Sequence, residues 1–431
     1  MERFVFKELI AWKNSVNRKP LILQGARQVG KTWLLKEFGK NEYKQLAYVN
    51  FEASAALRSL FAIDFDIDRI LTAIQIESGV KVTSDNTLII FDEIQEADKG
   101  ISCLKYFYEN APQYHVIAAG SLLGISLHQH TSFPVGKVDI LKLYPMSFQE
   151  FLVAMNKTDL QKLLQSNDWQ LIASFKEKYI DLLRLYYFIG GMPEVVNSYI
   201  VQRDFEQVRK IQNSLLIAYE NDFSKYAPTE IVPRIRMLWN SVLSQLSKEN
   251  KKFIYGAIKP GSRAKEFELA LSWLIDAGLL YKTNRISKPG LPLASYLDLS
   301  AFKLYFLDLG LLVAMGKLSA KTLLEGNAVF SEFKGALTEQ YVLQQLKTRS
   351  NLEIFYWTSG NSTAEVDFII QSEDKILPLE VKAAENLQAK SLKSYYLKYD
   401  PKLSARVSMS DYRFENWLVN IPLYAIESFP L

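Results

Sequence analysis

The sequence predicts a multidomain α/β protein whose N-terminal third is built on a parallel β-sheet. Two observations lead to this prediction. Short runs rich in β-branched residues alternate with segments of helical period in the first third of the chain, as is typical of a parallel sheet with helices on its faces. A glycine-rich turn lies between the first of these runs and the helical segment that follows it. The expected strands are residues 20–23, 45–51, 87–91, 115–119 and 138–143.

The rest of the chain has a different pattern. Residues 148–239 have a helical period. A helix candidate at 265–280 precedes two short extended runs, an order typical of a winged helix. After residue 300 the sequence returns to alternating helix and strand patterns. We therefore expect a sheet domain at 1–160, a helical segment at 161–239, a winged-helix-like domain at 240–300 and a mixed α/β domain at 301–431.

Composition excludes several classes of protein. The 51 Lys and Arg residues against 47 Asp and Glu residues give a net charge of +4, which is too small to imply nucleic-acid binding by itself. The single cysteine, Cys103, excludes an internal disulfide framework. No apolar run reaches the length of a membrane helix, and the first residues lack the pattern of a secretory signal. We expect a cytoplasmic protein without a membrane partner.

The glycine-rich turn has the pattern of a phosphate-binding loop. The letters GARQVGKT occupy residues 25–32, between an apolar strand and a helical segment. In such a loop the glycines let backbone amides surround phosphate oxygens, and the helix N-terminus adds partial positive charge. Lys31 would contact the β- and γ-phosphates and Thr32 would bind Mg²⁺. The expected nucleotide-binding residues are Gly25, Ala26, Arg27, Gln28, Val29, Gly30, Lys31, Thr32 and Trp33.

Two later segments complete the predicted site. The apolar run LIIFDE ends in Asp92 and Glu93, the position from which one carboxylate holds Mg²⁺ and a second activates water for ATP hydrolysis. The strand HVIAAG carries Ser121 to the same edge of the sheet, where its hydroxyl could sense the γ-phosphate. The alternatives are that DEIQEAD opens a helix with acidic residues and that Ser121 caps a turn.

A competing motif concerns the base of the nucleotide. Residues 156–159 read NKTD, a guanine-recognition pattern, but they follow a helical run where that motif requires a strand. The segment after Asp92 also lacks the DxxG pattern of GTPases. We therefore expect ATP as the nucleotide.

Taken in order, the motifs GARQVGKT, LIIFDEIQ, AAGSLLG, LYPMSFQEFL, YYFIGGMPEVV, EVDFII and LEVKA resemble a known family. It comprises bacterial and archaeal AAA-type ATPases with a C-terminal domain of unknown function related to restriction endonucleases. The resemblance implies an AAA/RecA-like P-loop core, with Gly25, Gly30, Lys31, Thr32, Asp92, Glu93 and the loop residue Arg27 in the ATP site. One departure is that family members often have Gly-Arg where this chain has Gly136 and Lys137. This position loses the bidentate guanidinium, and sequence does not choose between Arg184 and Arg203 as an arginine finger.

The C-terminal part reproduces the order of charges in the PD-(D/E)xK nuclease core. These charges are Glu339 on a helix, Asp367 on a strand, and Glu380 and Lys382 on the next strand. Residues two apart on a strand share a face, so Glu380 and Lys382 would point toward one site. Asp367 and Glu380 would hold Mg²⁺, Lys382 would position water, and Glu339 would complete the set. The alternative is a group of charges at strand ends, such as an ion pair of Asp367 with Lys382.

The winged-helix segment is locally basic. Between residues 244 and 290 nine basic residues face four acidic ones, an excess of five that exceeds the net charge of the whole chain. The basic residues are Lys248, Lys251, Lys252, Lys259, Arg263, Lys265, Lys282, Arg285 and Lys288. This favours action on nucleic acid, DNA rather than RNA. The alternative is an ATP-controlled switch or assembly protein, with an oligomer or protein partner and a C-terminal domain that docks without cleaving.

Overall fold

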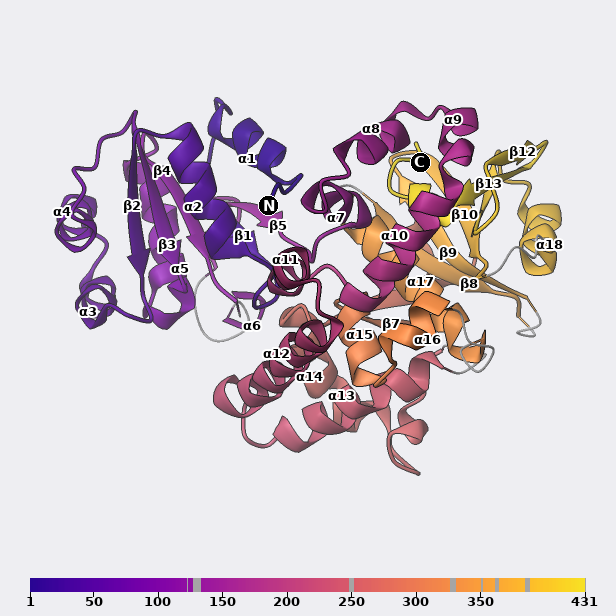
Figure 1. Ribbon diagram of the computed structural model, residues 1–431. Helices are drawn as coiled ribbons and strands as arrows, with labels where there is room; N and C mark the ends of the chain where they lie inside the picture. The colour runs from indigo at the N-terminus through magenta and orange to yellow at the C-terminus, as the bar shows by residue number, and fades with distance from the viewer. Residues whose placement is uncertain are drawn as a thin grey trace. The chain divides into compact units, whose positions relative to one another are not determined.

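The computed structural model describes residues 1–121, 123–126, 133–247, 252–325, 331–349, 352–360, 364–383 and 388–430. These residues form two compact units, shown with the rest of the chain in Figure 1. Unit 1 contains Met1–Tyr144 together with Asp276–Leu279. Unit 2 contains the other described residues from Pro145 onward.

Unit 1 is built on a five-stranded sheet in the order β2-β3-β4-β1-β5. All four pairings are parallel, as expected. Every residue of β3 is buried, as a strand inside a sheet covered on both faces requires. The strands are β1 Leu21–Gln24, β2 Gln45–Asn50, β3 Thr87–Asp92, β4 His115–Ala119 and β5 Asp139–Lys142.

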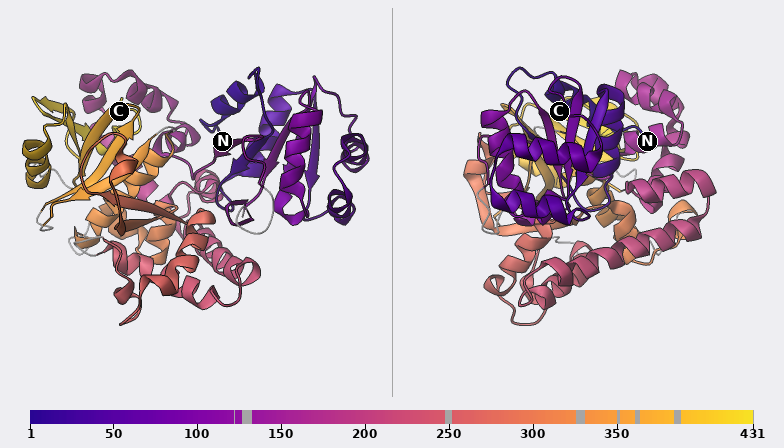
Figure 2. Two further views of the ribbon diagram at one scale, coloured as in Figure 1. Left: turned by 180° about the vertical axis from the view of Figure 1, so that it is seen from behind. Right: turned by 90° about the vertical axis from the view of Figure 1, so that its left-hand side faces the viewer.

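Helices cover both faces of this sheet (Figures 1 and 2). Their apolar faces and the strands form one core, in which the rings of Phe51, Phe61 and Phe91 pack edge to face. The helices are α1 Phe6–Lys13, α2 Lys31–Glu42, α3 Ala55–Ile63, α4 Ile67–Ser78, α5 Gly100–Asn110 and α6 Leu123–Ser126.

Unit 2 contains an eight-stranded mixed sheet in the order β12-β13-β11-β10-β9-β8-β6-β7. The strands are β6 Leu280–Ile286, β7 Leu297–Phe306, β8 Glu353–Thr358, β9 Glu365–Ser372, β10 Lys375–Val381, β11 Ser404–Ser408, β12 Arg413–Glu415 and β13 Leu418–Pro422. The hairpin expected as the wing of a separate domain is β6–β7, and β6 pairs with β8 in parallel. The hairpin therefore belongs to the C-terminal sheet, and the expected boundary at residue 300 falls inside β7.

Helices make up the rest of unit 2. The helical period of 148–239 is confirmed, because this stretch forms α7 to α13, and Asn156 and Lys157 of the NKTD motif lie between α7 and α8. The helices are α7 Phe148–Ala154, α8 Thr158–Ser166, α9 Trp169–Ser174, α10 Lys176–Ile189, α11 Pro193–Gln202, α12 Phe205–Tyr226, α13 Val232–Leu246, α14 Ala264–Asp276, α15 Leu309–Met315, α16 Ala320–Glu325, α17 Ser331–Lys347 and α18 Lys390–Tyr399. None of the described helices is long and apolar enough to span a membrane.

A buried polar network joins these helices to the sheet. Asp308 has no exposed surface. Its carboxylate accepts hydrogen bonds from the backbone N–H of Gly191 at 2.6 Å, the backbone N–H of Leu311 at 3.0 Å and the amide of Gln344 at 3.1 Å. Gln344 also donates to the hydroxyl of Tyr186 at 3.0 Å. Because a buried polar group costs stability unless it has partners, this network specifies how α10, α15 and α17 pack.

We expect Asp308→Ala to lower the free energy of unfolding of unit 2 by roughly 3 kcal/mol, because it leaves buried donors unpaired. The measurement is urea unfolding followed by circular dichroism. The matched control is Asp181→Ala, which removes an exposed carboxylate 3.4 Å from Arg184 and should change the midpoint little. Equal shifts for the two variants would contradict a structural role for the network.

Candidate functional site

The loop between β1 and α2 has the backbone that phosphate binding requires. Gly25 has no room for a side chain, because a Cβ atom there would lie 2.3 Å from the carbonyl oxygen of Leu143. Gly30 has φ of 93°, a left-handed conformation that glycine adopts without strain. Helix α2 begins at the next residue, Lys31. The N-terminal amides of α2 therefore face the loop, as the motif predicts.

Lys31 is buried, and its ammonium donates to the carbonyl oxygens of Gly25 and Ala26, both at 2.8 Å. Burial lowers the pKa of this ammonium to about 8, an effect that the nearby carboxylates of Glu93 and Asp92 partly offset. The ammonium thus has neutral oxygen partners at hydrogen-bond distance. Phosphate oxygens would be stronger partners than carbonyl oxygens, so the loop is suited to exchange one for the other.

Asp92 lies at the end of β3 and connects three elements. Its Oδ2 atom accepts from the hydroxyl of Thr32 at 2.8 Å and from the hydroxyl of Tyr48 at 2.7 Å. Its Oδ1 atom is buried and has no hydrogen-bond partner among the described residues. A buried carboxylate oxygen beside a threonine hydroxyl fits Mg²⁺, which prefers oxygen ligands and retains several waters.

Glu93 follows directly and adopts a left-handed backbone with φ of 51°. Its carboxylate accepts from the hydroxyl of Ser121 at 3.0 Å, from the backbone N–H of Ser121 at 3.2 Å and from the amide of Gln95 at 2.6 Å. Ser121 therefore lies at the same edge of the sheet as Glu93, as the sequence predicts, and its contact with Glu93 is an additional finding. Its role as a sensor of the γ-phosphate stays a prediction. Strained backbone at a polar site is typical of residues whose orientation matters for chemistry.

Sequence reasoning missed three residues of this site. Tyr48 has a weak sequence signal, because its strand β2 lies beside β3 and places it near Asp92. Gln95 lies within the motif LIIFDEIQ, but the motif does not indicate a role for it. Arg3 gave no local signal: its buried guanidinium donates to the carbonyl oxygens of Val29 at 2.9 Å and Tyr144 at 2.6 Å. Arg3 thus links the phosphate-binding loop to Tyr144, where the first segment of unit 1 ends.

The other candidate cations have local partners. Lys137 forms an ion pair with Glu109 at 3.1 Å, and Arg184 pairs with Asp181 in the same helix. Arg203 lies over the ring of Tyr199 at 5.1 Å. These contacts do not single out an arginine finger.

Of the three histidines, only His115 lies within the described residues. His115 bonds to the hydroxyl of Tyr43 at 2.6 Å, and burial lowers its pKa to about 4. His128 and His130 lie outside the described residues.

In unit 2 the predicted nuclease residues lie near one another, together with a lysine that sequence reasoning missed. Glu380 and Lys382 form an ion pair at 2.6 Å, as expected for residues on one strand face. Asp367 lies on β9, antiparallel to β10, and its Oδ1 atom is 3.8 Å from the ammonium of Lys303. Glu339 lies 3.6 Å from the same ammonium. In place of the alternative pairing, Asp367 lies beside Lys303 and Lys382 pairs with Glu380.

This arrangement does not fit the expected metal centre. Within the part of the chain that the structure describes, no three side chains of His, Cys, Asp or Glu are grouped so that they could hold a metal ion. The signal for Lys303 was present in the sequence, because a lysine interrupts an otherwise apolar strand, AFKLYF. Such a lysine, if buried, requires negative partners.

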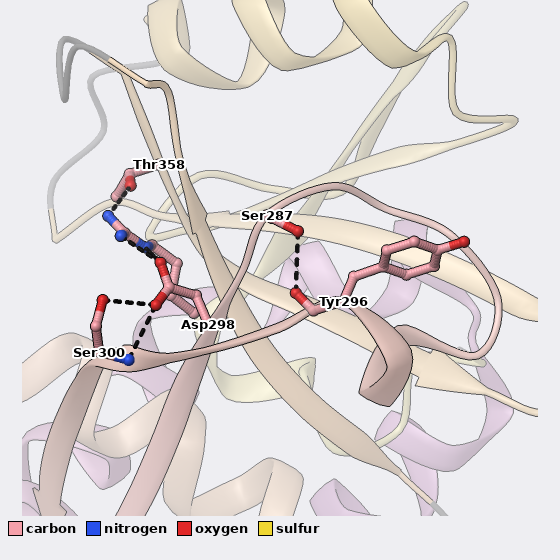
Figure 3. Close-up of polar contacts among 6 residues, drawn as sticks. Ser287, Tyr296, Asp298, Ser300 and Thr358 are labelled. Carbon is pink, nitrogen blue, oxygen red and sulfur yellow. Dashed lines mark hydrogen bonds and ion pairs between the residues drawn. The ribbon is translucent and has the colours of Figure 1, made fainter.

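Two of the basic side chains expected to face nucleic acid are used within the hairpin. Arg285 binds Asp298 through Nε at 3.0 Å and Thr358 through Nη1 at 3.1 Å. Figure 3 shows Asp298, Thr358 and Ser300 at this contact. Lys282 lies 4.5 Å from the ring centre of Phe302, and burial lowers its pKa. Lys248, Glu249 and Lys251 lie outside the described residues.

Two other cations of the basic segment, Arg263 and Lys265, lie beside an open hollow together with Arg234, which precedes the segment. A hollow of about 320 Å³ is lined by Arg234 of α13, by Arg263 just before α14, and by Lys265, Glu266 and Leu269 of α14. No ion pair joins the three cations to another residue that the structure describes.

Comparisons with known proteins agree with this geometry in unit 1. Residues 17–152 match the family described as AAA domain. Residues 180–322 and 334–426 match two families described only as domains of unknown function, DUF8612 and DUF4143. No curated protein matches the chain.

Several solved structures are distantly similar. A Walker-type ATPase of Pyrococcus abyssi is 14% identical with a TM-score of 0.46, over 73% of this chain and 95% of that one. ORC1 of Aeropyrum pernix, solved in complex with DNA, is 11% identical with a TM-score of 0.29, over 73% and 90% of the two chains. The RuvB Holliday junction branch migration motor of Thermotoga maritima is 14% identical with a TM-score of 0.28, over 66% and 90%. At these scores the likenesses say nothing about substrate or partner.

The phosphate-binding loop, helix α2 and the carboxylates after β3 all lie inside the residues that match the AAA family. Unit 1 therefore contains an AAA-type P-loop domain.

Proposed function

We propose that this chain is a Mg²⁺-dependent ATP hydrolase. The observation that carries the proposal is the convergence of Lys31, the Thr32–Asp92 pair and the Glu93–Ser121 pair at the carboxyl ends of β1, β3 and β4. Each has the chemistry that phosphoryl transfer requires, namely a cation for the phosphates, oxygen ligands for Mg²⁺ and a carboxylate for water.

Each of these residues has a separate role in ATP hydrolysis. Lys31 exchanges its carbonyl partners for phosphate oxygens, while the amides at the start of α2 bind the same phosphates. Thr32 and the buried Oδ1 atom of Asp92 would hold Mg²⁺, and the ion would supply positive charge to the phosphates. Glu93 orients the attacking water and accepts its proton. Ser121 and Gln95 keep the carboxylate of Glu93 at the end of the sheet until water and nucleotide are in place.

A second candidate function is binding of nucleic acid by unit 2. The observation that favours it is the open hollow beside Arg234, Arg263 and Lys265, whose cations could contact phosphodiester groups. The hairpin is less suited to this role, because there Arg285 is bound by Asp298. DNA is the expected polymer. The competing function is an ATP-controlled switch that binds a protein partner, and ATP turnover indifferent to DNA and RNA would favour it.

Substitutions at the phosphate-binding loop and after β3 should separate binding from hydrolysis. We expect Lys31→Ala to weaken ATP binding by roughly 10- to 100-fold, because a charge-assisted contact is lost. Glu93→Gln should keep ATP affinity and lower kcat by roughly 100-fold or more. The control is Asp98→Asn, an exposed acid in the same turn, which should leave both quantities unchanged. Full turnover by Glu93→Gln would exclude Glu93 as the base.

ATP binding should take up a proton at alkaline pH. Because the pKa of Lys31 is about 8, its side chain is mostly the neutral amine at pH 9 in the free protein. Bound phosphates favour the charged form, so binding at pH 9 should take up nearly one proton at this site, and binding at pH 7 should take up almost none. Calorimetry in two buffers of different ionisation enthalpy measures this uptake.

The matched control for proton uptake is Lys31→Arg, because guanidinium stays charged at both pH values. Uptake at pH 9 should disappear in this variant. If both proteins take up the same number of protons, the effect does not come from Lys31.

Replacing Arg234, Arg263 and Lys265 together by Gln should weaken DNA binding and reduce the slope of log K against log salt by roughly 3. The control replaces Lys162, Lys178 and Lys210, exposed cations of unit 2, and has the same change in net charge. The measurement is fluorescence anisotropy with labelled duplex DNA at several salt concentrations. Equal losses in the two triple variants would indicate a general effect of charge and would count against this surface.

A further inference from the structure

We infer that the ammonium of Lys303 is a permanent internal cation of the C-terminal carboxylate cluster, so that this cluster neither binds a divalent metal ion nor cleaves phosphodiesters. The cluster consists of Glu339 on α17, Glu365 and Asp367 on β9, and Glu380 at the end of β10. The resemblance to PD-(D/E)xK nucleases assigns three of these residues to a metal centre. The inference goes beyond the proposed ATP hydrolysis and does not depend on it.

The position of Lys303 supports this inference. The side chain extends from β7 and has no exposed surface. Its ammonium lies 2.5 Å from Oε1 of Glu365, 3.6 Å from Oε2 of Glu339 and 3.8 Å from Oδ1 of Asp367. It also lies 5.1 Å from the ring centre of Tyr356. The cation thus sits among three carboxylates contributed by two different elements.

The carboxylate oxygens nearest this position already have partners. Oδ2 of Asp367 accepts the backbone N–H of Val381 at 2.8 Å, while Oδ1 of Asp367 faces Lys303. Oε2 of Glu339 accepts the hydroxyl of Tyr305 at 3.3 Å. A Mg²⁺ ion requires oxygen ligands at 2.0–2.1 Å in near-octahedral geometry. To bind here it would have to displace both the ammonium and these hydrogen bonds.

Glu380 is the one member of the predicted metal pair that lies outside the contacts of Lys303. Its Oε1 atom pairs with Lys382 at 2.6 Å, and its buried Oε2 atom has no hydrogen-bond partner among the described residues. This oxygen offers a single ligand position, whereas Mg²⁺ requires a near-octahedral set of oxygens, and both oxygens of Asp367, the other member of the predicted pair, already have partners. The pairing with Lys382 further reduces the availability of Glu380.

The charge state of Lys303 is stable over the working pH range. Burial alone would lower the pKa of the ammonium, but the summed attraction of Glu339, Tyr305, Glu365 and Asp367 raises it well above its ordinary value. The cation therefore does not leave by losing its proton near neutral pH. A divalent ion placed beside it would meet a like charge in a site of low dielectric.

The connectivity explains where this cation comes from. Strand β7 belongs to the hairpin β6–β7, which joins the C-terminal sheet through β8. The hairpin thus delivers a lysine to the carboxylates of β9 and α17 and holds the sheet and helix together by charge. The carboxylates in nuclease-like order are therefore part of the core of unit 2. This arrangement favours a docking role for the C-terminal domain over cleavage of phosphodiesters.

The test measures Mn²⁺ binding to the full-length protein without nucleotide, by the loss of the free-ion electron paramagnetic resonance signal. We expect wild type, Asp367→Asn and Glu380→Gln to bind Mn²⁺ equally, with any binding removed by Asp92→Asn in unit 1. Mn²⁺ binding that is lost in both Asp367→Asn and Glu380→Gln would overturn the inference.

A second arm removes the internal cation. Lys303→Met leaves the carboxylates without their counter-ion, so we expect a lower Tm that millimolar Mn²⁺ raises by roughly 5 °C or more and EDTA lowers again, whereas wild type changes by roughly 1 °C or less. The control Lys382→Met removes the half-exposed partner of Glu380 and should gain no such dependence. If Lys303→Met folds and its Tm does not depend on Mn²⁺, this result would contradict the claim that the ammonium of Lys303 takes the place of a divalent ion. If Lys303→Met fails to fold, the wild-type titration decides.

Discussion

A buried ammonium must find negative or dipolar partners, and this constraint organises both units of the protein. Among the described residues, the ammonium of Lys31 in unit 1 has the carbonyl oxygens of Gly25 and Ala26 as hydrogen-bond partners, and burial lowers its pKa to about 8. Lys303 in unit 2 is surrounded by carboxylates, which raise its pKa. In the proposed function the first ammonium binds an anion, whereas the second already has carboxylate partners. The same kind of side chain thus belongs to a proposed nucleotide site in one unit and to an internal group of ion pairs in the other.

The loop sequence determines most of the site in unit 1 because its requirements are local. Glycine at position 30 permits the left-handed turn, and glycine at position 25 permits close contact with the backbone of Leu143, just after β5. Both can be recognised in eight consecutive letters. The carboxylates after β3 are equally recognisable, since an apolar strand must end where polar residues begin. These features could be predicted from sequence together with the order of strands and helices in the first third of the chain.

What could not be predicted depends on contacts between residues distant in sequence. Arg3 reaches the phosphate-binding loop 26 residues away and Tyr144 141 residues away, and no local pattern encodes either contact. The hairpin β6–β7 has the residues of a wing, but its place in the C-terminal sheet depends on two residue pairs with β8. Lys303 was visible as a lysine in an apolar strand, yet its partners come from α17 and β9. Local patterns thus predict secondary-structure elements and motifs, whereas the partners of buried charges become known only from the three-dimensional structure.

The difference between local sequence patterns and contacts of distant residues also changes how the basic segment should be interpreted. A count of formal charges treats Lys282, Arg285 and Arg263 as equal, but the structure separates them by their partners. Arg285 is held by Asp298 within the hairpin, and Lys282 lies against the ring of Phe302. A cation that already has a carboxylate partner must give up that partner before it can bind a phosphate, so it adds little to affinity for a polyanion. The exposed cations beside α14 carry no such cost. An excess of positive charge in a sequence segment therefore indicates a nucleic-acid surface only for the residues that remain after internal ion pairs are subtracted.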